Sequence, residues 1–249
     1  MSLDRFLTII KSEFPDDRLT YQKAVPTFHP ESAEDAAKLF KLANRAKQPL
    51  FITGFGNNID PQGEPFTGMV SVRTDRLNRL IAVVPDDFYV TAGSGYPLRE
   101  INYHLKEHNL WLPHASLPYV GSVGGAIAVG LSSIFDKHDF PLKKYFLQAE
   151  IVTPDGEIIR PGSVCFKSVS GYDIVRIFSG SWGLLGLIIS ASFRVMPLAA
   201  QAEYAKMKIE EVSRQRLLAS LREDNPDTNA VYSRKVKARF DTGNILPVV

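Results

Sequence analysis

Three glycine-rich loops contain the residues of this chain that are best suited to bind a ligand. They are Gly54-Phe55-Gly56-Asn57-Asn58, residues 118–126 (PYVGSVGGA) and residues 180–188 (GSWGLLGLI). Glycine weakens strands and helices, so clusters of glycine beside apolar runs indicate that bare backbone must come close to something. Each loop alone could be a structural turn. Together they favour a large ligand threaded between elements, and the best candidate is a dinucleotide.

The second of these loops is more specific for phosphate than the first. Gly121-Ser122-Val123-Gly124-Gly125 runs into a small apolar series that is typical of a helix start. Backbone amides left unpaired at such a start, with the Ser122 hydroxyl, would form an anion site suited to a pyrophosphate. The alternative is a glycine-rich helix that packs closely on a sheet.

The first loop begins like a Rossmann fingerprint but does not complete it. Ile59 stands where the third glycine of G-x-G-x-x-G belongs. That residue, and the lack of regular βαβ spacing after the loop, count against a nicotinamide-binding Rossmann enzyme. The third loop ends in a strand whose main-chain edge could pair with a purine.

Apolar periodicity and turn residues predict the helices and strands that hold these loops in place. The pattern predicts helices over residues 4–14, 34–47 and from Pro97 onward, and a polar helix over 209–222. It predicts strands over 50–53, 69–72, 80–84, 89–92, 146–153, 157–160 and 188–196. The strand at 50–53 runs directly into the first loop.

Composition places the chain among ordinary globular proteins. It has 249 residues, 45% of them hydrophobic. Its net charge of +2 does not indicate a strongly positive surface of the kind that binds nucleic acid. The lone Cys165 excludes an internal disulfide framework and a cysteine-based zinc or iron–sulfur site, so we expect a reducing, cytoplasmic setting. We expect no signal peptide and no integral membrane segment.

No residue pattern identifies a catalytic group or a metal site. His104 and His108 have helical ligand spacing but lack a third ligand, so solvent-facing positions are favoured. His114 precedes the second loop and could approach a bound ligand, although a plain loop residue is favoured. His29 and His138 carry no pattern, and no base is placed beside Cys165 by spacing.

Several short motifs follow one another in a fixed order from about residue 20 to 197. They are Pro26 with Glu31-Ser32-Ala33-Glu34-Asp35, then Gly54 to Asn57, Ala92-Gly93, Leu112-Pro113, residues 118–128, Val152 to Gly156, and Ser170-Gly171-Tyr172-Asp173 through Gly186-Leu187-Ile188. In these motifs the chain resembles the PCMH-type FAD-binding domain of the vanillyl-alcohol-oxidase-like flavoproteins. Within that group it is most similar to the smaller FAD-binding subunits of bacterial glycolate oxidases.

The resemblance implies an α+β fold in which FAD lies between two α/β subdomains. These would span about 1–66 and 67–197 of an FAD-binding domain over 1–197, and 198–249 would be a short C-terminal helical segment and tail, a much shortened substrate or cap region. The implied FAD-binding residues are Thr53, Gly54, Phe55, Gly56, Asn57 and Asn58 on one side of the pyrophosphate, Pro118, Gly121, Ser122, Val123, Gly124, Gly125 and Ala128 on the other side and toward the flavin, and Gly183, Gly186, Leu187 and Ile188 near the adenosine.

The same resemblance implies a function and partners. The chain would be the FAD-binding subunit of a glycolate or D-lactate oxidase-like or dehydrogenase-like complex, with a larger flavoprotein subunit and an iron–sulfur subunit. The FAD would be noncovalent, because the first loop lacks the His or Cys to which covalently flavinylated relatives attach it. Any contact with a membrane would be made through the partners. The alternative is a non-catalytic structural or assembly subunit that keeps the flavoprotein fold but binds FAD weakly or not at all.

Overall fold

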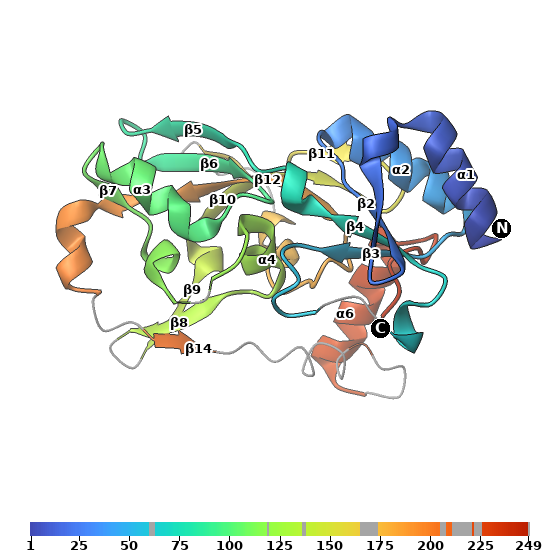
Figure 1. The fold of residues 1–249 in the computed structure, drawn as a ribbon. Coiled ribbons are helices and arrows are strands. Elements are labelled where there is room, and N and C mark those ends of the chain that lie inside the picture. Colours follow the sequence, from blue (N-terminus) through green and yellow to red (C-terminus); the bar gives the residue numbers. More distant parts are fainter. Residues whose placement is uncertain are drawn as a thin grey trace.

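Two larger β-sheets organise the chain, and each borders its own hydrophobic core (Figure 1). The structure is a computed structural model that describes residues 1–59, 63–118, 120–135, 138–164, 174–204, 208–210, 221 and 226–248. In Figure 1 the N-terminal sheet lies on the right with α1 and α2, and the second sheet extends to the left. This arrangement confirms the expected α+β class.

The N-terminal sheet is built around three parallel strands. Its order is β1-β2-β4-β3, and its strands span Leu19–Gln22 (β1), Val25–Phe28 (β2), Leu50–Thr53 (β3) and Val70–Arg73 (β4). β4 lies beyond residue 66 in the sequence, yet it pairs in parallel with both β2 and β3. The first sheet therefore extends to Arg73 and does not end near residue 66, because the chain returns from the first loop to the same sheet.

Helices α1 (Leu3–Glu13) and α2 (Ala33–Ala46) bury their apolar sides in the core of this sheet. α2 begins where the Ser32 hydroxyl accepts a hydrogen bond from the Asp35 amide at 3.0 Å, the usual arrangement of a helix N-cap. It ends at Lys47, whose φ of 54° is left-handed. Both helices lie where the apolar spacing of the sequence predicts them.

The second sheet is antiparallel throughout, in the order β11-β10-β12-β6-β5. Its strands span Leu80–Val84 (β5), Tyr89–Gly93 (β6), Phe146–Val152 (β10), Ile158–Ile159 (β11) and Leu187–Arg194 (β12), close to the predicted ranges. The short helices α3 (Ile101–Lys106) and α4 (Val123–Ala128) contribute to its core. In Figure 1 both helices lie on the same side of this sheet.

Two smaller pairings complete the second half of the chain. β7 (Leu110–Trp111) pairs with β13 (Met196–Pro197), and β8 (Ser132–Phe135) pairs with both β9 (His138–Pro141) and β14 (Lys208–Glu210). The helix predicted from residue 209 is wrong at its start, because Ile209 lies opposite Ser133 in a strand pair. Apart from residue 221, the rest of that predicted helix lies outside the described residues.

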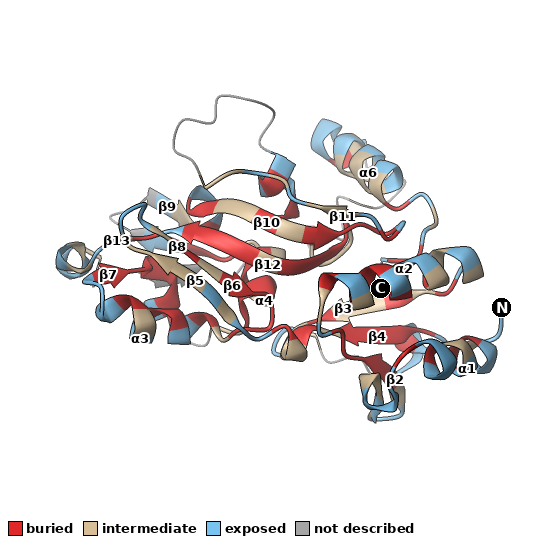
Figure 2. Cartoon of the chain, turned by 90° about the horizontal axis from the view of Figure 1, so that it is seen from above, coloured by how far each residue is buried: buried red, intermediate tan, exposed pale blue. Residues whose placement is uncertain are grey.

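β10 and β12 belong to both cores at once. Ile151 and Ile188 lie in the core that includes α4, whereas Val152 and Leu187, their neighbours along each strand, lie in the core that includes α2. Neighbouring side chains of a strand point to opposite faces, so one strand pair can serve two cores. Figure 2 shows β10 and β12 largely buried. This shared wall sets the position of one sheet relative to the other.

The described C-terminal residues lie beside β3. After α6 (Thr228–Phe240), the chain turns so that the Ile245 carbonyl accepts a hydrogen bond from the Leu50 amide at 2.6 Å. The Asp241 carboxylate holds this turn by accepting hydrogen bonds from the amides of Ile245 and Leu246, each at 2.9 Å, and from the Lys237 ammonium at 2.5 Å. Ile245 and Leu246 are buried in the N-terminal core, so the tail supports the strand that leads into the first loop.

We expect Asp241→Ala to destabilise the protein by about 3 kcal/mol, because the change leaves two buried amides and a mostly buried ammonium without their acceptor. Urea unfolding followed by circular dichroism measures the loss. Asp16→Ala is the matched control, since Asp16 is exposed and has no ion pair with any described residue. Equal stability of the two variants would contradict the anchoring role of Asp241.

Candidate functional site

The first loop leaves the N-terminal sheet at the carboxyl end of β3, next to the end of β4. Gly56 has a φ of +83°, a conformation that glycine adopts without strain. Within the described part of the chain, the amides of residues 54–59 donate to no protein acceptor. A run of free amides at the end of a parallel strand is a site for an anionic group such as phosphate. The first loop therefore supplies the free donors of the site.

The first and second loops meet at two glycines. A side chain on Gly54 would place its Cβ 2.7 Å from the Ser122 hydroxyl, closer than real Cβ atoms approach an oxygen. A side chain on Gly121 would come within 3.3 Å of the Asn57 amide nitrogen. Gly54 is thus required by the position of the Ser122 hydroxyl, whereas at Gly121 the exposed Asn57 side chain would have to give by a few tenths of an ångström. Residues far apart in the sequence therefore lie side by side and form a single cradle.

The start of α4 does not offer the free amides expected of it. The Val123 amide donates to the Tyr96 carbonyl at 2.9 Å, and the Gly124 amide donates to the Ser94 carbonyl at 2.7 Å. The Gly125 amide donates to the Ser122 hydroxyl, which caps the helix. These contacts anchor α4 to the segment after β6. The expectation that the helix start has unpaired amides is therefore wrong. Of the described amides of the second loop, those of Val120, Gly121 and Ser122, just before the helix, have no acceptor in the described chain.

The segment that anchors α4 is a part of the site that the sequence analysis did not single out. It is the glycine pair around Ser94, and a Cβ on Gly95 would lie 1.9 Å from the Thr74 carbonyl. A Cβ on Gly124 would lie 2.8 Å from that of Ser94. The sequence signal for this segment was Gly95, the glycine that follows Ala92-Gly93, because it marks another place where one stretch of backbone comes close to another.

The third loop packs between α4 and β3. The Gly180 amide donates to the Ile127 carbonyl and the Trp182 amide donates to the Ala128 carbonyl, both at 2.9 Å. A Cβ on Gly183 would lie 3.1 Å from that of Ile52. The third loop is therefore joined to both of the elements that carry the other two loops. The Gly171-Tyr172-Asp173 motif that precedes it lies outside the described residues, as does Cys165.

Some of the predicted site residues could contact a ligand only through main-chain groups, whereas others have exposed side chains. Val123, Leu187 and Ile188 bury their side chains in the cores, so they can offer a ligand only main-chain groups. β12 pairs with β10 at Leu187 and Ile188, whereas its pairing with β6 begins only at Ser190. In the described structure, the β6-facing edge of β12 is thus open to main-chain pairing at Leu187. Thr53 is buried at the end of β3, and Asn57, Asn58 and Pro118 are exposed.

Ionisable groups lie beside the loops and not within them. His29 connects Thr20 to Asp75, with its Nε2 2.8 Å from the Thr20 hydroxyl and its Nδ1 2.7 Å from an Asp75 oxygen. Burial acts to raise the pKa of Asp75, but the hydrogen bond from His29 and the charges of His29 and Arg73 outweigh it and lower the pKa below its usual value. These contacts tie the end of β4 to β1 and β2. Among the described residues, no cluster of His, Cys, Asp or Glu could hold a metal ion.

His114 is a buried core residue and does not line an open site. Its ring stacks on Phe140 with centroids 5.2 Å apart and meets Tyr145 edge-on at 5.3 Å. Its Nε2 lies 2.9 Å from the Phe140 carbonyl, and its Nδ1 has no hydrogen-bond partner. Burial lowers the pKa of His114 to about 4, only partly offset by the bond to Phe140, so the ring is neutral at pH 7.

Comparison with known proteins agrees with this geometry. Residues 26–162, over half of the chain, match the protein family described as FAD binding domain. The D-lactate dehydrogenase of Archaeoglobus fulgidus is 25% identical over 206 residues, which cover 78% of this chain and 46% of that protein. Glycolate oxidase subunit GlcE of Escherichia coli is 32% identical over 166 residues, which cover 64% of this chain and 46% of that protein.

A solved structure supports the same fold. Alkyldihydroxyacetonephosphate synthase superposes with a TM-score of 0.64 at 20% sequence identity, over 78% of this chain and 40% of that one. The chain thus spans less than half the length of these relatives. None of the helices described is long and apolar enough to cross a membrane.

We expect the stability of the protein to fall between pH 6.5 and pH 4 because of His114. In this window the unfolded chain protonates the ring and the folded protein does not, so protons favour unfolding, by about 3 kcal/mol at pH 4. His114→Gln should remove this part of the pH dependence, measured as unfolding free energy at pH 7 and pH 4.5. His108→Gln changes an exposed ring and should behave as the parent protein. An unchanged slope in His114→Gln would refute the assignment.

Proposed function

The chain belongs to the family of FAD binding domains, and we propose that it is the FAD-binding component of an oxidoreductase that acts on a 2-hydroxy acid, glycolate or D-lactate. FAD is its cofactor. The observation that carries the proposal is the cradle formed where the free amides of the first loop meet Gly121 and Ser122. The names of the relatives, D-lactate dehydrogenases and glycolate oxidase subunits, support the substrate class.

Each loop has a role in this proposal. The amides of residues 54–59 would hold the pyrophosphate, with Gly121 and Ser122 on the opposite side. At Gly54 and Gly121 the lack of a side chain leaves room for the Ser122 hydroxyl and the Asn57 side-chain amide of the facing loop. The open main-chain edge of β12 at Leu187 would pair with the adenine. Bound FAD would supply the hydride acceptor that oxidation of a hydroxyl group needs.

Substrate chemistry would depend on groups outside the loops. None of the three loops contains an Asp, Glu, His, Lys or Arg. Oxidation of a 2-hydroxy acid needs a base for the hydroxyl proton and a cation for the carboxylate. We propose that a larger flavoprotein subunit and an iron–sulfur subunit complete the enzyme, and that the FAD is held noncovalently. The alternative is a non-catalytic structural or assembly subunit that has the same fold but binds FAD weakly or not at all.

The first test is whether the purified chain binds FAD and whether a substrate reduces it. FAD at a concentration 100-fold above its dissociation constant should stabilise the protein by about 2.7 kcal/mol, seen as a rise in melting temperature. Glycolate or D-lactate should then bleach the flavin absorbance under anaerobic conditions once the partner chains that copurify from the host are added. FAD binding without bleaching in the complete complex would contradict the proposed substrate class. Weak binding or none would refute the cradle and favour the assembly subunit.

The second test is Gly54→Ala, which we expect to weaken FAD binding about tenfold or more. The new methyl group would displace the Ser122 hydroxyl, and with it the cap of α4. Isothermal titration with FAD measures the loss. Ser122→Ala is the matched control, because it removes the cap without filling the cradle. Adding Ser122→Ala to Gly54→Ala should recover part of the affinity. A Gly54→Ala protein with parental affinity would show that FAD does not lie in this cradle.

A further inference from the structure

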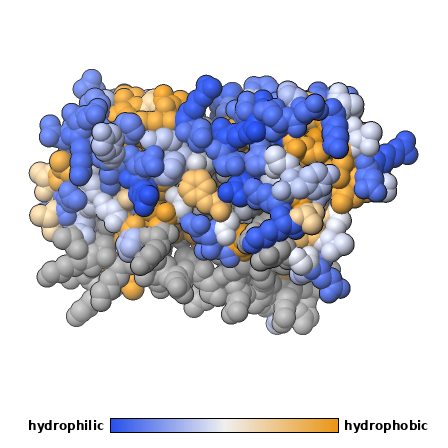
Figure 3. All heavy atoms as spheres, in the orientation of Figure 1, coloured by the Kyte–Doolittle hydropathy of each residue, from blue (hydrophilic) through white to orange (hydrophobic). Residues whose placement is uncertain are grey.

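β5 is an edge strand with an unusually apolar sequence. It is the last strand in the order of the second sheet, so one of its edges faces no strand of the described chain. Its residues are Leu80-Ile81-Ala82-Val83-Val84, none of them charged. Ile81 is 56% exposed, and the nearby Phe88 is 40% exposed. In Figure 3 hydrophobic residues gather at the upper left of the molecule, where Figure 1 places β5.

Edge strands usually carry a charge or a proline that blocks pairing with another chain. β5 has neither within its length, although its pairing with β6 shifts register between Leu80 and Ala82 and Pro85 directly follows the strand. Its charges lie just outside its two ends. Arg79 precedes the strand, whereas Asp86 and Asp87 follow it, and all three are exposed. None of the three makes an ion pair with another residue of the described structure. The strand is therefore positive at its start and negative at its end.

We propose that β5 pairs in antiparallel fashion with β5 of a second copy of this chain. A two-fold axis near the middle of the strand would bring Arg79 of one copy beside Asp86 and Asp87 of the other, and the reverse contact would form at the other end. The two five-stranded sheets would then form one continuous sheet across the dimer. The pairing satisfies the free main-chain groups of both edges and covers both copies of Ile81.

A second copy fits this edge because its charge pattern is self-complementary. An isologous interface requires that one surface match itself after a two-fold rotation. An antiparallel strand with a cation at one end and carboxylates at the other meets that requirement, whereas a parallel pairing would place like charges together. A pair of five-residue strands buries less than the roughly 1,200 Å² of a standard interface, so we expect a reversible equilibrium that depends on concentration.

Sedimentation equilibrium of the purified full chain tests the proposal. The parent protein should shift from monomer to dimer as its concentration rises. Arg79→Glu should weaken the dimer about tenfold, because each dimer then holds two contacts between like charges. Asp86→Lys should weaken it similarly, and the double variant Arg79→Glu with Asp86→Lys should restore it. Ile81→Lys should abolish it, because it places a charge on the pairing edge.

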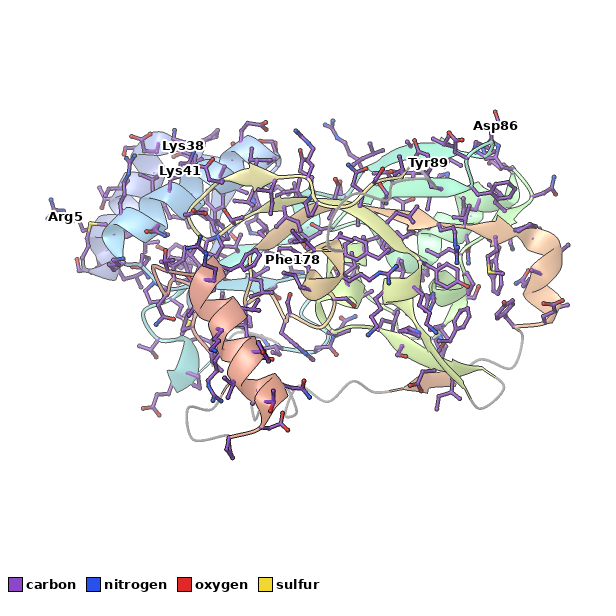
Figure 4. All side chains as sticks on the ribbon, turned by 180° about the vertical axis from the view of Figure 1, so that it is seen from behind. Arg5, Lys38, Lys41, Asp86, Tyr89 and Phe178 are labelled. Atoms are coloured by element: carbon purple, nitrogen blue, oxygen red, sulfur yellow. The ribbon has the colours of Figure 1, made fainter. Side chains whose placement is uncertain are left out.

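Arg5→Glu is the matched control, because Arg5 lies on α1 at the opposite end of the molecule from Asp86 (Figure 4). Its dimer should be as strong as that of the parent. A monomer at every concentration up to about 1 mM would overturn the proposal. So would a dimer that neither Ile81→Lys nor the charge reversals weaken, since it would form at another surface. Pairing of β5 with a different protein, while the pure chain stays monomeric, would also refute it.

Discussion

The site depends on one strand pair that serves two hydrophobic cores. β10 and β12 are hydrogen-bonded to each other, and their alternating side chains enter the core of the second sheet on one face and the core around α2 on the other. Neighbouring residues such as Leu187 and Ile188 therefore lie in different cores. The two sheets cannot move apart without exposing apolar side chains from both strands, and each fully buried Leu or Ile side chain contributes about 2 kcal/mol. That constraint places the end of β3 against the start of α4.

The loops that form the cradle are anchored to different degrees, although both sides keep free amides, at residues 54–59 and at Gly121 and Ser122. The second and third loops are anchored: α4 donates to Tyr96 and Ser94, and the third loop donates to the end of α4. The first loop is anchored only through β3, which the C-terminal tail supports at Leu50. Its amides stay free because no described carbonyl reaches them. A rigid side and a side with free donors together suit a phosphate-bearing ligand better than two saturated turns would.

The three loops of the cradle contain no acidic or basic side chain. The loops that form the cradle contain glycine, asparagine, serine and apolar residues, and the ionisable groups near them are engaged in structural contacts such as His29 with Asp75. His114, four residues before the second loop, is buried and neutral at pH 7. The chain spans less than half the length of its relatives.

Local sequence patterns were sufficient to predict most of the helices and strands. Both long N-terminal helices, β3 and the strands of the second sheet follow from apolar periodicity, and the three glycine loops mark the site, because period and glycine are properties of neighbouring residues. Three features depended on tertiary contacts. β14 replaces the start of a predicted helix because β8 offers it a partner, α4 loses its free amides to Ser94 and Tyr96, and β4 joins the first sheet across a loop. Glycine spacing thus indicates where the backbone must approach another group. Which amides remain free depends on the fold, because a hydrogen-bond partner is set by distance in space and not by distance along the chain.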